Sequence, residues 1–289
     1  MATNNSRPSK AERTASAREK AAQMRAAQEA AAKRKSLFVK LGVLGAVILV
    51  IALVVTLIVQ NNDTKVADAG AVPAGGNAAG GILVTSPTTV ADKTVENVDI
   101  TKLQTPSEVP AKPEMRDLTV GKKGEPVNIT MVVDANCVHC ADFEATYGKQ
   151  INDWLAAGDV TVEYRNVGYL DGGSATNFSS RAANALACVA NDTPKAYMPF
   201  VTALWGHYQQ GEMKNAQLAE MAIVNGASKD VTSCIDKGEF RSFVQYTTQV
   251  AKYDGVAGTP TIVVQGKVVD LASQDFPTTV EAAIKANKK

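Results

Sequence analysis

Two cysteines separated by two residues, Cys137 and Cys140, stand where a predicted strand meets a predicted helix. Residues 127–134, VNITMVVD, form a largely apolar and β-branched run, which is typical of a central strand. From about residue 137 to 157, apolar residues recur at the spacing of one helix face. Residues 159–167 then alternate as a second strand. The pattern predicts a strand-helix-strand unit with Cys137 at the first turn of its helix.

The position at a helix start favours redox chemistry for this pair. A thiol attacks a disulfide only as the thiolate, and a helix N-terminus within Cys-x-x-Cys lowers the thiol pKa to about 3.5–7.5. We expect Cys137 to be the nucleophile and Cys140, one turn further, to be the resolving thiol. His139 lies between them and can stabilise the Cys137 thiolate, which would make the disulfide a stronger oxidant. The alternative is an exposed histidine without a role.

Two other interpretations of the pair compete with redox chemistry. A zinc site commonly needs four ligands, and the second histidine of the chain, His207, falls in a distant helical region, so no metal is expected. A purely structural Cys137–Cys140 disulfide would make the domain a non-catalytic binding module. Measuring the Cys137 pKa separates this module from an enzyme.

The rest of the C-terminal part predicts an α/β fold. Residues 173–255 carry helical periodicity throughout. TPTIVVQGKVVDL then predicts a hairpin that turns at Gln265-Gly266, and PTTVEAAIKANKK predicts a closing helix. Together with the strand-helix-strand unit, these elements predict a mixed sheet flanked by helices, with a helical insertion before the C-terminal hairpin.

A family resemblance follows from these motifs. Cys-x-x-Cys at a strand-helix junction, followed far downstream by Thr259-Pro260 in AGTPTIVV, resembles the thioredoxin superfamily over about residues 120–289. The helical insertion and the pattern D-x-x-C-x-x-C resemble membrane-anchored DsbA-like thiol-disulfide oxidoreductases of Gram-positive bacteria. The resemblance implies a thioredoxin-like fold with a cis proline opposite the dithiol. It also implies that Thr259 and Pro260 bind substrate chains.

Three departures from that family leave the direction of electron flow open. Val138 stands where strongly oxidising relatives often have proline. Met131 stands where many relatives carry a buried acid, so Asp134 or Glu144 is a candidate for handling protons. Thr259 also occurs before the proline in reducing and isomerising relatives. A disulfide reductase or isomerase, for example one serving cytochrome maturation, therefore remains the alternative to an oxidase.

The other two cysteines, Cys188 and Cys234, lie in separate predicted helical segments. We interpret them as a structural disulfide that fastens the insertion. A closed loop of this length, about 46 residues, would contribute about 4 kcal/mol through chain entropy. The alternatives are two free thiols or a relay to Cys137.

The N-terminal part contains nineteen consecutive uncharged residues, 41–59, which is enough for a helix to cross a bilayer. A buried core helix and a cleaved signal peptide are the alternatives, but forty residues precede the run, which favours an uncleaved anchor. Residues 1–40 carry ten Lys and Arg against three Asp and Glu, or +7, and the other 249 carry twenty against twenty-six, or −6. The positive-inside rule places the N-terminus in the cytoplasm and the body outside. All four cysteines lie beyond the run, as expected where disulfides persist.

The predicted organisation has four parts. Residues 1–40 form a basic cytoplasmic segment and 41–59 a single transmembrane helix. Residues 60–115, rich in Gly, Ala and Pro, form a flexible tether and polar loop. Residues 116–289 form the thioredoxin-like catalytic domain, with its helical insert at about 173–255.

The predicted function is that of a membrane-tethered, extracytoplasmic thiol-disulfide oxidoreductase that forms disulfides in exported proteins. Its partners would be unfolded or exported proteins with reduced cysteines, and no nucleic acid. The resemblance implies reoxidation by a DsbB-like or vitamin K epoxide reductase-like membrane protein. No bound cofactor is expected.

Overall fold

The computed structural model describes Met24 and residues 66–288. The predicted basic segment and transmembrane helix therefore lie outside the described residues, apart from Met24. None of the described helices is long and apolar enough to span a bilayer. The chain divides into two units, residues 1–65 and residues 66–289, and the second holds all four cysteines.

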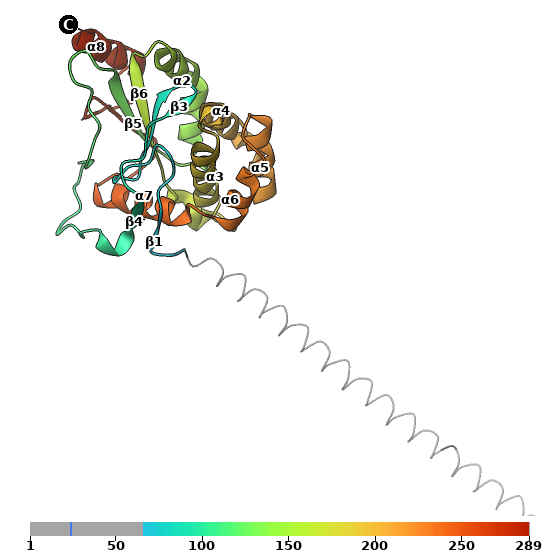
Figure 1. The fold of residues 1–289 in the computed structure, drawn as a ribbon. Coiled ribbons are helices and arrows are strands. Elements are labelled where there is room, and N and C mark those ends of the chain that lie inside the picture. The colour runs from blue at the N-terminus through green and yellow to red at the C-terminus, as the bar shows by residue number, and fades with distance from the viewer. Residues whose placement is uncertain (1–23, 25–65, 289) are drawn as a thin grey trace, which may run out of the picture. The chain divides into compact units, whose positions relative to one another are not determined.

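This second unit is a mixed sheet with helices on both faces (Figure 1). The elements are β1 (Ala69–Ala71), β2 (Ile82–Ser86), β3 (Thr89–Val90), β4 (Asn97–Asp99), β5 (Val127–Val133), α2 (Val138–Ala156), β6 (Val160–Asn166), α3 (Phe178–Asp192), α4 (Tyr197–Gly206), α5 (Asn215–Val224), α6 (Val231–Lys237), α7 (Arg241–Tyr253), β7 (Thr261–Val264), β8 (Lys267–Val268) and α8 (Phe276–Lys288). The main sheet has the order β3-β2-β6-β5-β7-β8. The predicted α/β fold with a mixed sheet, a helical insertion and a closing hairpin is confirmed.

Strand β5 lies inside the sheet and sets the position of the site. It pairs in parallel with β6 and antiparallel with β7, and every residue of β5 is buried. A strand covered on both faces needs the continuous apolar, β-branched run that the sequence has here. The chain therefore leaves the end of β5 at the edge of the core and enters α2 directly after it.

One face of the sheet is covered by α2 and α8. Their aromatic side chains interlock, with the ring of Phe276 about 5 Å from the rings of Phe143 and Tyr147 (5.0 and 5.2 Å between centroids). Trp154 also contacts Phe276, at 6.0 Å between centroids. Phe143, Tyr147 and Trp154 lie on the apolar face that the helical spacing predicted for α2. The packing holds α2, and hence the dithiol at its start, against the sheet.

Helices α3 to α6 form a separate lobe beside the sheet (Figure 1). Helix α7 packs against the face of the sheet opposite α2 and α8. On this opposite face, two charges from β6 are buried as a pair. Arg165 Nε donates to Glu163 Oε1 at 2.7 Å, and both side chains are at most 1% exposed. Arg165 also donates to the carbonyl oxygens of Arg116 and Asp117 at 3.2 and 3.3 Å. Arg165 thus ties residues 116–117 of the irregular segment 103–126 to the body.

The prediction that residues 66–81 form a flexible tether is wrong. Strand β1 pairs with β4 in a two-stranded antiparallel sheet that contacts α7, and Val72 and Ala79 are 2% and 0% exposed. The glycine-rich composition led to the wrong prediction, because glycine here allows the backbone to pack closely against α7 and does not make the segment flexible. At Gly80, with φ +81°, a Cβ would lie 2.8 Å from the Cα of Thr247 on α7. The folded unit thus begins near residue 66, well before the predicted domain start at 116.

Candidate active site

The candidate site forms where β5 ends and α2 begins. Cys137 is the N-cap of α2, with extended backbone angles of φ −96° and ψ 122°. The backbone N–H groups at the start of a helix have no partner within it, and they stabilise negative charge placed there. The N–H groups of His139 and Cys140 approach the Cys137 sulfur in this way. The sequence thus places a thiol where an anion is favoured.

Cys137 is buried, at 7% exposure, and is held in a network of hydrogen bonds. Its Sγ lies 3.2 Å from the carbonyl oxygen of Thr259 and donates to it when the thiol is protonated. The hydrogen bond with the Cys140 thiol lowers the pKa of Cys137 most, and burial opposes it. The side chain of Thr259 and the two helix N–H groups lower the pKa further, to about 5. At neutral pH this sulfur is therefore a thiolate, the reactive form.

Cys140 has the opposite character, although it lies one helical turn away. Its side chain is 2% exposed. Burial raises the pKa of the Cys140 thiol strongly, and the neighbouring Cys137 sulfur raises it further. One dithiol therefore combines a stabilised thiolate with a buried thiol that keeps its proton.

The second half of the site comes from the segment before β7. The Thr259–Pro260 peptide bond is cis, and Thr261 pairs with Val132 near the end of β5. This antiparallel pairing carries Thr259 back to the start of α2. Cys137, Cys140, Thr259 and Pro260, which the sequence motifs predict for the site, therefore lie at one place in the fold.

A family model described as thioredoxin matches residues 114–286, which is more than half of the chain. The chain belongs to the thioredoxin family.

Solved structures show which thioredoxin relatives share this architecture. The reduced form of a disulfide bond oxidoreductase (DsbG) from Mycobacterium tuberculosis is 27% identical, with a TM-score of 0.50, covering 61% of this chain and 88% of that chain. Oxidised DsbA from the same organism is also 27% identical, with a TM-score of 0.50 and coverage of 64% and 90%. BdbD from Bacillus subtilis, 24% identical with a TM-score of 0.50 and coverage of 61% and 98%, shares the fold. This thioredoxin-family chain has the fold of DsbA-like thiol-disulfide oxidoreductases.

Curated relatives match a shorter stretch. Serine/threonine-protein kinase PknE of Mycobacterium tuberculosis (strain ATCC 25618 / H37Rv) is 32% identical over 127 residues. The match covers 41% of this chain and 22% of the kinase, so the chain spans about a fifth of the length of these relatives.

His139 and Val138, between the two cysteines, are both exposed. The His139 backbone N–H contributes to lowering the Cys137 pKa. Within the described residues, no hydrogen bond joins the His139 side chain to Cys137. The predicted role of the His139 imidazole stays a prediction; the stabilisation that the structure describes comes first from the Cys140 thiol and then from the Thr259 side chain and the N–H groups of the helix start.

Asp134 positions two backbone segments next to the dithiol. It is fully buried and follows β5 directly. Its carboxylate accepts hydrogen bonds from the N–H of Asn136 at 2.8 Å and of Leu170 at 3.0 Å. One acid thereby ties the turn that enters the dithiol to the loop that follows β6. The sequence suggested Asp134 only for proton handling, and this geometry assigns it to loop positioning.

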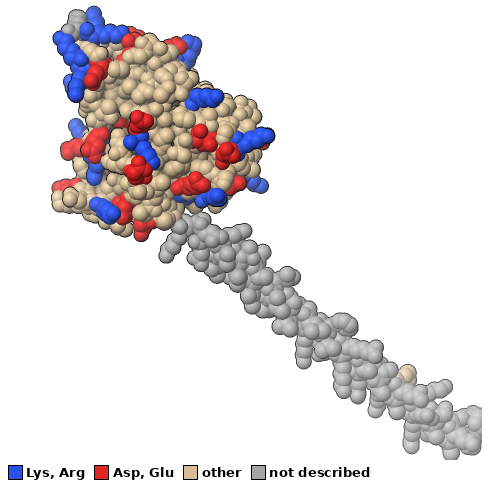
Figure 2. All heavy atoms as spheres, viewed as in Figure 1, with Lys and Arg blue, Asp and Glu red and all other residues tan. Residues whose placement is uncertain are grey.

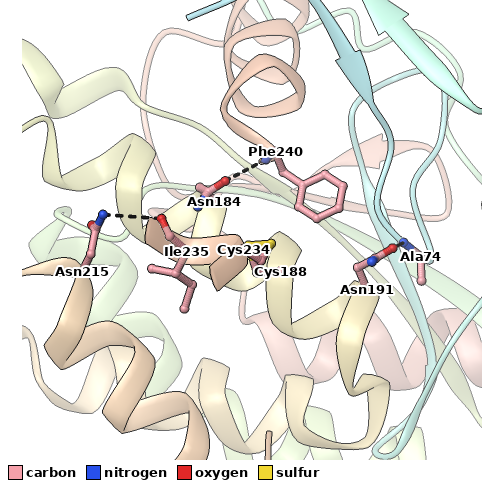
Figure 3. The surroundings of a disulfide bond; sticks show 8 residues. All are labelled: Ala74, Asn184, Cys188, Asn191, Asn215, Cys234, Ile235 and Phe240. Atoms are coloured by element: carbon pink, nitrogen blue, oxygen red, sulfur yellow. Dashed lines mark hydrogen bonds between the residues drawn. A yellow bond between two sulfur atoms is a disulfide. The ribbon is translucent and has the colours of Figure 1, made fainter. Parts of the chain in front are cut away.

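The remaining two cysteines form a disulfide in the helical lobe (Figure 3). Cys188 on α3 bonds to Cys234 on α6, across a sequence separation of 46 residues. Next to it, Asn184 Oδ1 accepts a hydrogen bond from the N–H of Phe240 at 2.8 Å, just before α7 (Figure 3). Helices α3, α6 and α7 are thus joined at one point. Among the described residues, no group of three His, Cys, Asp or Glu is arranged to hold a metal ion.

Proposed function

We propose that this protein is a membrane-tethered, extracytoplasmic thiol-disulfide oxidoreductase that forms disulfide bonds in exported proteins. One observation carries the redox assignment: the Cys137 sulfur lies 3.2 Å from the carbonyl oxygen of Thr259. This contact places a thiol with a pKa of about 5 beside backbone that can receive a substrate chain. A structural disulfide requires neither feature.

In the proposed reaction, a substrate thiolate attacks Cys137 of the Cys137–Cys140 disulfide. A substrate–Cys137 bond forms, and Cys140 leaves with the electron pair and takes up a proton. A second substrate thiolate then attacks the substrate sulfur of the mixed disulfide. The substrate disulfide forms, and Cys137 leaves as a thiolate. Because the Cys137 thiolate is stabilised, the reduced protein is favoured and the disulfide acts as an oxidant.

The surface beside the dithiol suits unfolded substrates. Val138 and Leu170 are 39% and 40% exposed, and Leu170 is tied through its N–H to Asp134, just before the dithiol. Exposed apolar side chains at this place can contact apolar segments that folding would hide. Acidic and basic side chains are interspersed over the face of the molecule shown in Figure 2, so that face does not favour binding partners of one charge sign. Thr259 and Pro260 would pair with the substrate backbone beside Cys137.

The membrane location rests on sequence features. They are the nineteen-residue uncharged run at 41–59, the excess of basic residues before it, and the confinement of all four cysteines to the part after it. A protein placed there would pass its electrons to a membrane reoxidase, of the DsbB-like or vitamin K epoxide reductase-like kind. Kinase activity is not proposed, since the match covers only 22% of the kinase.

The test is oxidation of a reduced, unfolded protein with paired cysteines, together with the reduction potential of the dithiol. An oxidase gives catalysed disulfide formation and a potential nearer about −120 mV than about −270 mV. A potential at the reducing end without thiol oxidation would favour the reductase or isomerase. A Cys140→Ala variant should trap substrates as mixed disulfides on Cys137, and a non-catalytic module would trap none. The Cys188→Ala, Cys234→Ala double variant is the matched control, because it removes cysteines outside the site.

A further inference from the structure

A group of buried polar side chains lies where α2, β6 and α4 meet, and α2 is the helix that begins after Cys137 and carries Cys140. We call Glu144, Tyr164, Asn166 and Tyr197 the buried polar cluster. Glu144 belongs to α2, Tyr164 and Asn166 to β6, and Tyr197 to α4. Each is at most 7% exposed. Four polar side chains from three elements thus meet in the core next to the site.

Three members of the cluster contact one another, and the charge of Glu144 acts on the two tyrosines among them. Asn166 Nδ2 donates to the hydroxyl of Tyr197 at 3.3 Å. The rings of Tyr164 and Tyr197 pack edge to face, with centroids 5.8 Å apart. The Glu144 carboxyl lies over Gly148, where a Cβ would come within 2.6 Å of Oε1. Glycine at 148 therefore leaves the room that this carboxyl occupies.

Three polar atoms of the cluster have no hydrogen-bond partner in the described part of the protein. They are Glu144 Oε1, the Tyr164 hydroxyl and Asn166 Oδ1. An unpaired buried polar group costs about 1–3 kcal/mol, and native proteins satisfy such groups with ordered internal water. Three such atoms in one cluster indicate a site for internal water.

Glu144 can change its protonation state there at physiological pH. Burial alone raises the pKa of its carboxyl to about 7. The titratable groups that face it are Tyr164 from β6 and Tyr197 from α4, and both have pKa values raised by burial and by Glu144 itself. On its own helix, Cys140 lies one turn before it. The described residues provide no ion-pair partner for Glu144.

Cys140 needs a proton carrier in either direction of the reaction. Its buried thiol keeps its proton, yet it must lose that proton to attack a mixed disulfide on Cys137 and regain it when the disulfide opens. Residues i and i+4 of a helix are neighbours on one face, and Cys140 and Glu144 both face the core. The Glu144 carboxyl itself extends toward Gly148, one turn further from Cys140, so water must bridge the two groups. Asp134, the other buried acid nearby, already accepts two backbone hydrogen bonds. Glu144 has a free carboxyl oxygen in the described part of the chain.

We propose that Glu144 is the proton acceptor and donor for Cys140, and that the proton moves through internal water held by the buried polar cluster. This assignment rests on the proposed function. When the disulfide closes, the Cys140 proton passes to the Glu144 carboxylate and Cys140 Sγ attacks Cys137 Sγ. The new sulfur–sulfur bond forms, and the electron pair of the broken bond leaves with the partner sulfur as a thiolate. When the disulfide opens, the Glu144 carboxyl returns the proton.

The test separates the two thiol steps with oxidised glutathione as the probe. Mixing it with reduced full-length protein releases one glutathione when Cys137 attacks and a second when Cys140 attacks the mixed disulfide. Acid quenching and mass spectrometry follow both steps between pH 5 and 9. In the wild type, the second rate should rise to a plateau with a midpoint near pH 7, the pKa of Glu144.

Glu144→Gln should slow the second step at least tenfold at pH 7.5 and abolish its midpoint, while the first step stays within twofold. Glu144→Asp should restore the midpoint at a lower rate. Asp142→Asn removes an exposed carboxylate from the same helix and should match the wild type in both steps. A wild-type second rate and midpoint in Glu144→Gln would overturn the proposal.

Two further outcomes are informative. If the wild type forms no mixed disulfide, the proposed function itself fails, and the assignment of Glu144 falls with it. If Glu144→Gln does not fold, carbon-13 NMR of the glutamate carboxyls in the wild type decides. One carboxyl should titrate near pH 7 and respond to oxidation of the dithiol, and the absence of any glutamate titrating above pH 6 would overturn the proposal.

Discussion

The Sγ atom of Cys137 lies 3.2 Å from the carbonyl oxygen of Thr259, although 122 residues separate them in sequence. The contact exists because β5 and β7 pair antiparallel, with Val132 opposite Thr261. The chain leaves β5 toward Cys137 and enters β7 from Thr259, so both reach the same edge of the sheet.

The first prediction concerns the reactivity of Cys137. Its alkylation rate by iodoacetamide should rise with pH through a midpoint near 5 and then level off, because the thiolate is the reactive form. Cys140→Ala should move the midpoint upward, since the Cys140 thiol is the largest cause of the lowered pKa. The urea-unfolded chain is the control and should titrate near 8.5. The same midpoint near 8.5 in the folded protein would remove the basis for redox activity.

A second prediction concerns stability. A thiol pKa that is lower in the folded than in the unfolded chain stabilises the folded state, fully above the unfolded value and not at all below the folded one. The reduced protein should therefore gain stability relative to the oxidised protein as pH rises from about 5 to about 8.5. Urea unfolding of both forms at pH 5, 6.5 and 8 measures this. A difference that stays constant over the window contradicts it.

The third prediction tests the Cys188–Cys234 disulfide. A closed loop of 46 residues restricts the unfolded chain, which corresponds to about 4 kcal/mol in the chain-entropy model. The Cys188→Ala, Cys234→Ala double variant should lose about 2–4 kcal/mol of unfolding free energy. The Cys137 pKa should not change, because both bonded cysteines lie in the helical lobe. An unchanged unfolding free energy would show that the bond does not restrict the unfolded chain.

The fourth prediction compares two ion pairs of equal length. Arg165–Glu163 and Lys149–Asp153 both have N–O distances of 2.7 Å, but the first is at most 1% exposed and the second is 88% and 63% exposed. Arg165→Met leaves a buried carboxylate unpaired and should cost about 3–5 kcal/mol. Lys149→Met should cost less than about 1 kcal/mol. Chemical denaturation measures both, and equal losses would refute the role of burial.

The fifth prediction tests the docking of residues 66–81. Gly80 and Gly124 have nearly the same φ, +81° and +84°. A Cβ at Gly80 would meet the backbone of Thr247, whereas one at Gly124 would meet nothing within 4 Å. Gly124→Ala should cost about 1–2 kcal/mol for the left-handed backbone. Gly80→Ala should cost about 1–3 kcal/mol more, because its methyl group overpacks against Thr247. Thermal unfolding compares the two variants, and equal unfolding temperatures would mean that residues 66–81 can move away from α7.

The local pattern around the dithiol was sufficient to predict much of this fold. The apolar run before Asp134, the helical spacing after Cys137 and the turn at Gln265-Gly266 each encode one element through short-range chemistry. The pairing of β5 with β7 brings two of these elements together, and the family motif pointed to it. Short-range sequence patterns therefore predict the elements that surround the dithiol.

Other features depend on contacts that no local pattern reports. The docking of residues 66–81 depends on a close approach between Gly80 and Thr247. The buried polar cluster unites Glu144 with Tyr197, fifty-three residues later (197 − 144), and its tyrosines resemble ordinary core aromatics in sequence. The exposure of His139 depends on side-chain direction at the helix start. Each requires the tertiary structure.

The antiparallel pairing of β5 with β7 separates two tasks within the chain. Helices α3 to α7 lengthen the path from the dithiol to Pro260, but the strand pairing alone fixes how near those residues lie. Changes in the helical lobe can therefore accumulate without moving Thr259 away from Cys137. Under the proposed function, the substrate range can diverge while the reacting atoms stay in place.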